Sequence, residues 1–396
     1  MSGEVAAVAP AEPGEPRFEP RREWAEWKGR PADEAWTVGV EEEVMLVAPG
    51  SWALAYEADD VRPGFGPELA ARASAEVHGA ALELGTGVHA GVPSAVGELG
   101  ALRRGLHDAL VAAGLRAASA GTHPFALWSD TVLSAGKRYE AIYGSMRELA
   151  RREPTFGLHV HVGVPDPEDA FRVFDRLRGH IPLFLALSAN SPFWQGRDTG
   201  LASARTPLFQ AFPRVGIPRH FASYEEWIRT VGVLVDHEAI AEPTFLWWDV
   251  RPQPRFGTVE VRIMDAQITL EATAALAALV QSVACLELRE GWIGQGMLEL
   301  PEVLEENRFL AARDGMRAAI VDPDGDRRVP ARELLERLVA AARPHAQDLA
   351  CEAELLHALE LGGNSGAAEQ LVLARGPDRL PGLVEALAER FVTPSG

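Results

Sequence analysis

Acidic, imidazole and guanidinium side chains recur at every second position in four short segments of the chain. Valine, leucine and isoleucine residues stand between them, so each segment alternates polar and aliphatic positions. The polar members are Glu41 and Glu43 in the first segment, Glu83 in the second, His159 and His161 in the third, and Glu260 and Arg262 in the fourth. Carboxylates and imidazoles bind metal ions, and arginine binds phosphate groups. The pattern therefore predicts a site for divalent cations and phosphate chemistry.

Four β-strands are expected to position these side chains. Residues 37–48, 80–85, 156–164 and 257–265 are short and alternate with a period of two, which is typical of half-buried strands. Successive side chains of a strand point to opposite faces, so the polar set would share one face of a sheet. A solvated face is usually built from Thr, Ser, Lys and Gln, whereas here nearly every position is Glu, His or Arg. Glu42 is an exception, because it falls on the aliphatic face.

Several acids on one face need a partner of opposite charge. Carboxylates two positions apart on a strand lie roughly 7 Å apart and repel each other by about 2 kcal/mol at an effective dielectric constant of about 20. Mg²⁺ fits best, because it takes oxygen ligands and is shared between carboxylates and substrate phosphates, and Mn²⁺ is an alternative. A second interpretation is a zinc-dependent amide hydrolase that uses His159 and His161 as metal ligands.

Composition excludes several other classes of protein. The chain has 396 residues, of which 47% are hydrophobic and 24% charged, as in an ordinary globular protein. Its formal net charge of −19 disfavours binding to nucleic acid or anionic membranes. Lys28 and Lys137 are its only lysines, so there is no P-loop lysine. No secretory signal and no long apolar run is apparent, so a cytoplasmic protein is expected. Cys285 and Cys351 are expected to be buried and structurally inert.

The predicted elements indicate one large α+β domain. Residues 1–35 contain five prolines among alternating charges and are predicted to form a flexible, Pro-rich acidic tail. Residues 36–393 contain no linker, so we expect a single catalytic domain with a largely antiparallel sheet and helices on one face. Helical spacing of apolar residues ends at Gly114 in one segment and recurs in seven others, at 167–179, 224–235, 270–290, 301–319, 331–343, 346–361 and 379–391.

Seven sequence blocks, taken in order, resemble those of the type 2 glutamate–cysteine ligase family, also called carboxylate–amine ligases. The blocks are Gly39-Val40-Glu41-Glu42-Glu43, Gly121-Thr122-His123-Pro124-Phe125, His159-Val160-His161-Val162-Gly163, Leu187-Ser188-Ala189-Asn190-Ser191-Pro192-Phe193-Trp194, Asp198-Thr199-Gly200-Leu201-Ala202-Ser203, Trp247-Trp248-Asp249-Val250-Arg251-Pro252 and Gly257-Thr258-Val259-Glu260-Val261-Arg262. The resemblance spans roughly residues 36–320. It implies a sheet like that of glutamine synthetase and an ATP-dependent ligase, which phosphorylates a carboxylate and then joins it to an amine.

The resemblance also implies roles for individual residues. It implies a Mg²⁺-binding set around the ATP phosphates, consisting of Glu41, Glu43, Glu83, His159 or His161, and Glu260. Arg262 would neutralise charge on the transferred phosphoryl group, which makes Glu260 and Arg262 the expected catalytic pair. Arg205, with Arg251 as second choice, would bind the carboxylate of a glutamate-like substrate. The partners implied are a small carboxylate and an amine, and a homo-oligomer is left open. A non-catalytic relative that binds nucleotide or amino acid is the third interpretation.

Overall fold

An antiparallel sheet forms the centre of the protein in the computed structural model, which describes residues 23–31, 34–152, 154–375 and 379–392. Within these residues the sheet has seven strands in the order β10-β11-β5-β1-β3-β2, and β4 pairs with the end of β1. The strands are β1 (Val38–Val47), β2 (Ala73–Ala75), β3 (Ala81–Gly85), β4 (Arg116–Ala118), β5 (Gly157–Gly163), β10 (Val250–Gln253) and β11 (Thr258–Asp265). The predicted α+β class and all four predicted strands are thereby confirmed.

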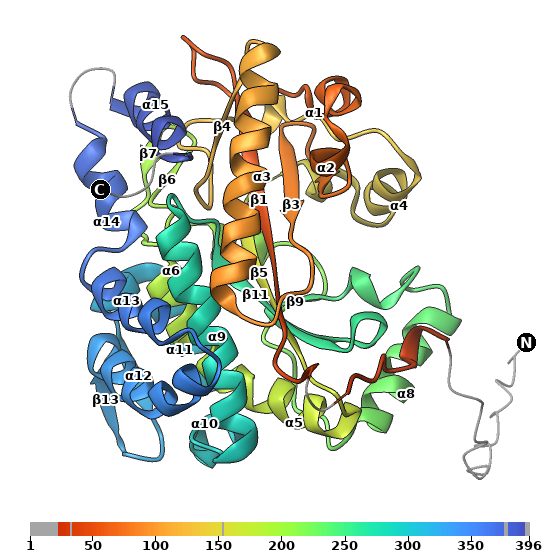
Figure 1. Cartoon of the computed structure of the whole chain (residues 1–396), viewed down its shortest axis with the longest axis vertical. Helices are drawn as coiled ribbons and strands as arrows, with labels where there is room; N and C mark the ends of the chain where they lie inside the picture. Colours follow the sequence, from red (N-terminus) through yellow and green to blue (C-terminus); the bar gives the residue numbers. More distant parts are fainter. Residues whose placement is uncertain (1–22, 32–33, 153, 376–378, 393–396) are drawn as a thin grey trace, which may run out of the picture.

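Long helices cover one face of this sheet (Figure 1). Their inward residues meet the aliphatic face of the strands, including Val40 on β1 and Val160 on β5, both of which are buried. The longer helices are α3 (Val92–Ala112), α4 (Lys137–Met146), α5 (Pro167–Leu177), α6 (Ile181–Ser188), α8 (Tyr224–Asp236), α9 (Leu270–Arg289), α11 (Pro301–Asp314), α12 (Ala331–Asp348), α13 (Glu352–Gly363), α14 (Gly366–Leu373) and α15 (Arg379–Arg390). Of these, α3, α5, α6, α9 and α15 contact strands of the sheet, whereas α4 borders the cavity. The opposite face of the sheet stays open to a cavity.

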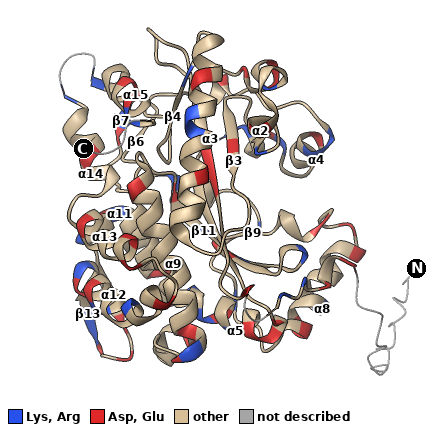
Figure 2. Ribbon diagram, in the orientation of Figure 1, with Lys and Arg blue, Asp and Glu red and all other residues tan. Residues whose placement is uncertain are grey.

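Short elements connect these parts. The short helices are α1 (Ala58–Val61), α2 (Pro67–Ala70), α7 (Arg205–Phe209) and α10 (Gln295–Glu299), with 3₁₀ turns η1 (Glu23–Ala25), η3 (Arg62–Gly64), η4 (Trp128–Asp130), η5 (Arg147–Arg151), η6 (Arg178–His180), η7 (Pro243–Phe245), η8 (Pro254–Phe256) and η9 (Gly315–Arg317). Three small sheets pair β6 (Phe193–Trp194) with β7 (Arg197–Asp198), β8 (Val215–Gly216) with β9 (Trp247–Trp248), and β12 (Ala319–Asp322) with β13 (Arg327–Pro330). Acidic and basic residues are interspersed on the outer helices (Figure 2).

Helix α9 is the central core helix. By length and composition alone it could cross a membrane, but 89% of its most apolar 18-residue stretch is buried inside the protein. It packs against α3, α5, α12 and α13. Cys285 on α9 and Cys351 before α13 are both buried and unpaired, as expected. Burial raises the pKa of the Cys285 thiol to about 11, so it is protonated and unreactive near pH 7.

Two helix predictions were wrong at their boundaries. The helix expected over 301–319 ends at Asp314, because Gly315 has φ of 56°, and the chain then forms η9 and β12. The break expected between 343 and 346 does not occur, because α12 continues through Pro344 to Asp348. Packing of α12 against α9 and α13 outweighs the local cost of a proline inside the helix.

The domain begins earlier than Trp36. Residues 1–22 of the predicted tail lie outside the described residues, but residues 23–31 lie against the domain beside α8 (Figure 1). Ala25 is fully buried and Trp27 is 8% exposed. We call residues 23–31 the N-terminal strap.

The position of Glu42 on the aliphatic face is explained by Arg103. Both side chains are completely buried, and Arg103 Nε donates to Glu42 Oε2 at 2.7 Å, with a second contact between Nη2 and Oε1. The same guanidinium donates to the carbonyl groups of Gln267, Ile268 and Phe391. Glu42 is therefore half of a buried ion pair that connects β1 with α3, and Arg103 extends the contact to Phe391, directly after α15.

Candidate active site

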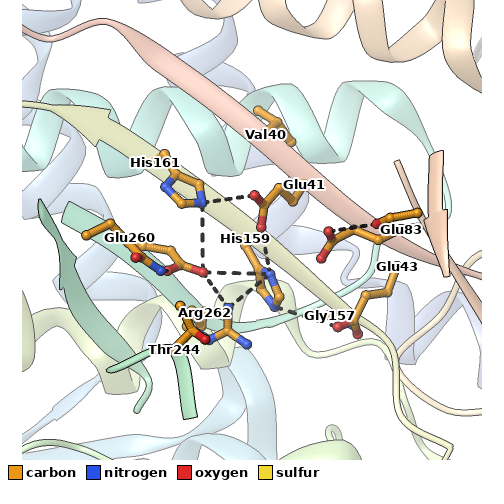
Figure 3. Close-up of polar contacts among 12 residues, drawn as sticks. Val40, Glu41, Glu43, Glu83, Gly157, His159, His161, Thr244, Glu260 and Arg262 are labelled. Carbon is orange, nitrogen blue, oxygen red and sulfur yellow. Dashed lines mark hydrogen bonds and ion pairs between the residues drawn. The ribbon is translucent and has the colours of Figure 1, made fainter. Parts of the chain in front are cut away.

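Strand register brings the predicted polar residues together on the open face of the sheet. Glu41 lies opposite His159, Glu43 opposite Glu83, and Glu260 opposite His161. Directly opposite residues on antiparallel strands have neighbouring side chains. Figure 3 shows these carboxylates and imidazoles converging from β1, β3, β5 and β11. The parity argument from the sequence thus places each of these side chains on the correct face.

These side chains line one cavity of about 350 Å³. All nine residues predicted for the site border it, namely Glu41, Glu43, Glu83, His159, His161, Arg205, Arg251, Glu260 and Arg262. Apolar side chains also border the cavity, among them Ile142, Met146, Ala150, Phe209 and Phe212. The cavity therefore combines a highly charged floor with a wall suited to hydrocarbon groups.

Three groups of side chains within the described residues could each hold a cation. They are Glu41 with His161 and Glu260, Glu41 with Glu83 and His159, and Glu43 with Glu76 and Glu83, with the ligand atoms of each group within 4.8 Å of one another. Carboxylate-rich groups of this kind suit Mg²⁺ or Mn²⁺. The two imidazoles fall in different groups, so the geometry does not favour a zinc site built on both histidines.

Glu76 was missed by the sequence reasoning. It follows the three-residue strand β2, whose alanines lack the β-branched side chains that identified the other strands. Its only sequence signal is the alternation of Ser74 and Glu76, which is too short to distinguish from a loop. Burial and the nearby carboxylate of Glu43 raise the pKa of Glu76 to about 7.

The acids at the two ends of the cavity differ in their charge state. At the β3 end, burial and the carboxylates of Glu41 and Glu76 raise the pKa of Glu83 well above its usual value. At the β11 end, burial is outweighed by Arg251 and Arg262, which hold the pKa of Glu260 well below its usual value. Nearby arginines therefore do not balance the carboxylates at the β3 end, and a bound cation would supply the positive charge that is needed.

His159 has a neutral ring nitrogen suited to a cation, whereas at His161 burial is outweighed by the carboxylates of Glu41 and Glu260, which raise the pKa of that ring. Nδ1 of His159 lies 3.4 Å from Glu41 Oε2, and its Nε2 is 3.9 Å from Glu43 Oε1. Neither His159 Nε2 nor His161 Nε2 makes a well-aligned hydrogen bond with a described residue, although both atoms are buried. Burial and Arg262 lower the pKa of His159, so its ring is neutral and carries a lone pair. The donor set therefore fits divalent cations at this site.

Arg251 and Gln253 form the support of Glu260. Arg251 Nε and Gln253 Nε2 donate to Glu260 Oε2 at 2.6 and 2.7 Å, and Arg262 Nη1 contacts Oε1. Arg251 Nη1 also donates to the carbonyl groups of Thr244 and Leu246. Most hydrogen-bond donors of Arg251 are thus used within the protein, whereas Arg262 has fewer protein partners and faces the cavity (Figure 3).

Arg205 reaches the cavity past Gly157. Its guanidinium donates to the carbonyl groups of Ile263 and Arg262, and its buried Nε has no hydrogen-bond partner among the described residues. A Cβ at Gly157 would lie 2.4 Å from Arg205 Nη2, so glycine is required for this approach. The unpartnered N–H gives Arg205 capacity to bind an anionic group.

Behind Arg205 lies a buried polar layer that includes Gln370 of α14. Asp265 accepts hydrogen bonds from Ser191, Ser203 and the backbone of Asn190. Gln370 of α14 donates to Asn190, so the segment around it supports this layer and does not border the cavity.

His123 has a structural role and makes stability depend on pH. Its Nδ1 accepts from the backbone N–H groups of Phe125 and Ala126, and its Nε2 donates to the Trp52 carbonyl at 2.8 Å. The two contacts to Nδ1 require the neutral ring, because protonation removes the Nδ1 lone pair, and burial lowers the pKa of His123 to about 4. The unfolded chain, with a pKa of about 6.5, binds the proton first, so this contribution to stability is lost as the pH falls from about 6.5 to 4.

We expect His123 to lower the free energy of unfolding by about 2–3 kcal/mol between pH 7.5 and 4.5. Urea unfolding of the wild type and His123→Asn across this range measures the difference, because Asn retains an acceptor but does not titrate. His237→Asn, at an exposed position, is the control and should keep the wild-type slope. Parallel profiles for wild type and His123→Asn would contradict this assignment.

Comparison with known proteins places the chain among ligases. The sequence model described as "Glutamate-cysteine ligase family 2(GCS2)" matches residues 37–383. A Rubrobacter xylanophilus protein named "Putative glutamate--cysteine ligase 2-3" is 42% identical over 361 residues, covering 90% of this chain and 98% of the relative. A similarly named protein of Sorangium cellulosum is 40% identical over 326 residues, covering 82% of this chain and 87% of the relative.

Solved structures share the fold at low sequence identity. The glutamate–cysteine ligase of Francisella tularensis, solved in complex with AMP, has a TM-score of 0.67 at 14% identity and covers 93% of this chain and 90% of its own. The bifunctional glutathione synthetase of Pasteurella multocida has a TM-score of 0.64 at 14% identity, covering 91% of this chain and 52% of its own. The sheet and its helical layer are therefore shared with the Francisella enzyme and with about half of the Pasteurella enzyme.

Proposed function

The chain belongs to glutamate–cysteine ligase family 2 and is a ligase, and on this premise we propose that it is an ATP-dependent carboxylate–amine ligase. It forms an amide, first of all a γ-glutamyl amide such as that of glutamate with cysteine, through an acyl-phosphate intermediate. The observation that carries this proposal is the convergence of Glu41, Glu43, Glu76, Glu83 and Glu260 on one cavity. Phosphoryl transfer needs positioning and charge neutralisation, and no protein nucleophile.

The reaction has two steps. A carboxylate oxygen of the first substrate bonds to the γ-phosphorus of ATP, the bond to the β–γ bridging oxygen breaks, and ADP leaves. The amine nitrogen then bonds to the acyl carbon, the bond to the phosphate oxygen breaks, and the nitrogen loses a proton to the buffer. Binding holds the two reactants of each step side by side, which removes most of the entropic cost of bringing them together.

The residues of the site divide these tasks. Glu41, Glu43, Glu76, Glu83, Glu260, His159 and His161 would hold Mg²⁺ or Mn²⁺. Bound cations neutralise the phosphate oxygens and the acids together. Arg262 faces the transferred phosphoryl group, and Arg205 binds the carboxylate of a glutamate-like substrate through its unpartnered donor. Arg251 is assigned here to positioning Glu260, with its substrate-binding role as the alternative.

The proposed setting is the cytoplasm, where ATP and Mg²⁺ are supplied, with small-molecule partners and neither nucleic acid nor membrane. The alternatives are a zinc-dependent amide hydrolase and a non-catalytic binding protein. Measuring the metal content of the purified protein distinguishes the hydrolase from the ligase. A zinc hydrolase would retain stoichiometric zinc, whereas a ligase would hold Mg²⁺ loosely.

An ATP-consumption screen of carboxylate and amine pairs tests the function, beginning with glutamate plus cysteine. We expect ADP and phosphate to be released only when ATP, divalent cation, carboxylate and amine are all present. Omitting each component in turn is the control. Amide hydrolysis without nucleotide consumption, or no turnover with any pair, would count against the ligase.

A further inference from the structure

The N-terminal strap lies outside the family-matched residues 37–383 yet contacts the rim of the cavity. Lys28 N donates to the Pro254 carbonyl at 2.9 Å, and Arg30 Nη2 donates to the Phe256 carbonyl at 2.7 Å. Both acceptors belong to η8, the 3₁₀ turn that connects β10 with β11. The strap is therefore hydrogen-bonded to both ends of this turn.

The strap is itself anchored firmly in the domain. Trp27 Nε1 donates to the Val164 carbonyl at 2.9 Å, directly after β5, and the Val164 amide donates to the Gly257 carbonyl at 3.0 Å. The Tyr224 hydroxyl of α8 donates to the Ala25 carbonyl at 2.7 Å. The strap, the end of β5 and the turn thus form one hydrogen-bonded unit.

Gly257 is the point of closest approach. It has φ of 63°, and a Cβ there would lie 2.1 Å from the Lys28 carbonyl oxygen. This atom belongs to backbone, so a side chain at position 257 would displace the strap or the turn. Close packing here leaves the turn little freedom to move.

The turn presents Phe256 to the cavity. Phe256 is 46% exposed and borders the cavity, and its ring lies edge-to-face against His161, with ring centroids 6.1 Å apart. His161 belongs to one of the candidate cation groups. An exposed aromatic ring beside a phosphate site can stack on an aromatic base, and in the proposed reaction of glutamate with cysteine only ATP carries one.

We propose that Phe256 contacts the base of the nucleotide and that the N-terminal strap is the positioning element that holds Phe256 in place. This inference rests on the proposed use of ATP. Phe256 is the binding residue, whereas Arg30 and Gly257 act through the turn. Loss of the strap contacts thus weakens nucleotide binding without touching the groups that carry out the reaction.

Calorimetric titration of the full chain with Mg·ATP and with Mg·tripolyphosphate, which lacks a base, tests the contact. We expect Phe256→Ala to weaken ATP binding about five- to tenfold and to leave tripolyphosphate binding unchanged. Equal weakening of both ligands, or no weakening of either, overturns the proposal. If the wild type does not bind Mg·ATP, the proposed function itself fails, so the two failures are distinguishable.

Two matched pairs of variants test the strap. Gly257→Ala is paired with Gly114→Ala, since Gly114 also has positive φ, 79°, but apart from its chain neighbours no described residue has an atom within 4 Å of its added Cβ. Arg30→Met is paired with Arg229→Met, an exposed arginine on α8. We expect the KM for ATP to rise about fivefold in the first member of each pair only, with kcat at saturating ATP changed less than about twofold. If the KM for ATP is unchanged in both Gly257→Ala and Arg30→Met, whatever their melting temperatures, the strap does not position Phe256 and the proposal is overturned.

Discussion

Glu83→Gln is expected to make the cation-free protein more stable and almost inactive. Burial and three neighbouring carboxylates raise the pKa of Glu83, so near pH 7 this acid destabilises the fold. Glutamine has the same size without the charge, and we expect a gain on the order of 1 kcal/mol, or about 2 °C in melting temperature. The same change removes a ligand shared by two cation groups, so turnover should fall by about 10²-fold or more.

The measurements are thermal unfolding in EDTA and initial rates at saturating Mg²⁺. Ser74→Ala is a suitable control, because Ser74 lies opposite Glu83 on β2 and donates to it at 3.4 Å without belonging to a cation group. Its activity should stay near that of the wild type. Lower stability of Glu83→Gln in EDTA, or near-normal turnover, would contradict the arrangement. Glu260→Gln is a poorer probe, because it would leave Arg251 and Arg262 without their buried counter-ion.

Arg103→Met should cause a large loss of stability. The substitution leaves the fully buried Glu42 carboxyl group without its counter-ion, and it removes the donors to three backbone carbonyl groups. Removing one partner of a buried ion pair costs about 3–5 kcal/mol. Chemical denaturation of the purified variant would measure the loss, with expression at low temperature if the yield is reduced.

Arg104→Met is the matched control, since Arg104 is the next residue of α3 and is exposed. It should unfold within about 0.5 kcal/mol of the wild type. The double variant Glu42→Leu with Arg103→Met removes both charges and should recover part of the loss. Equal effects of the two arginine substitutions would show that the buried pair is not a major source of stability.

Local pattern in the sequence predicts the strands and most of the site, because a period of two fixes which face a side chain occupies. Glu41, His159 and Glu260 were placed on one face by parity alone, and register then made them neighbours. The class of fold followed from the same strands and the apolar periods of the helices.

Features that depend on distant partners could not be predicted in this way. Glu42 looked anomalous because its counter-ion, Arg103, is 61 residues away. Glu76 belongs to a strand too short to show a period, and the proline-rich composition around the strap hid two tryptophans that pack on α8. In each case the tertiary contact, and not the local sequence, determines the position.

The contact of Arg103 with the Phe391 carbonyl joins residues that are 288 positions apart. During synthesis, β1 and α3 leave the ribosome long before α15 exists, and the guanidinium lacks one of its acceptors throughout that interval. The nascent chain therefore cannot complete the layer behind its acidic strand until nearly the whole domain has emerged. Cells that make this protein slowly would expose an unfinished core to chaperones and proteases for longer.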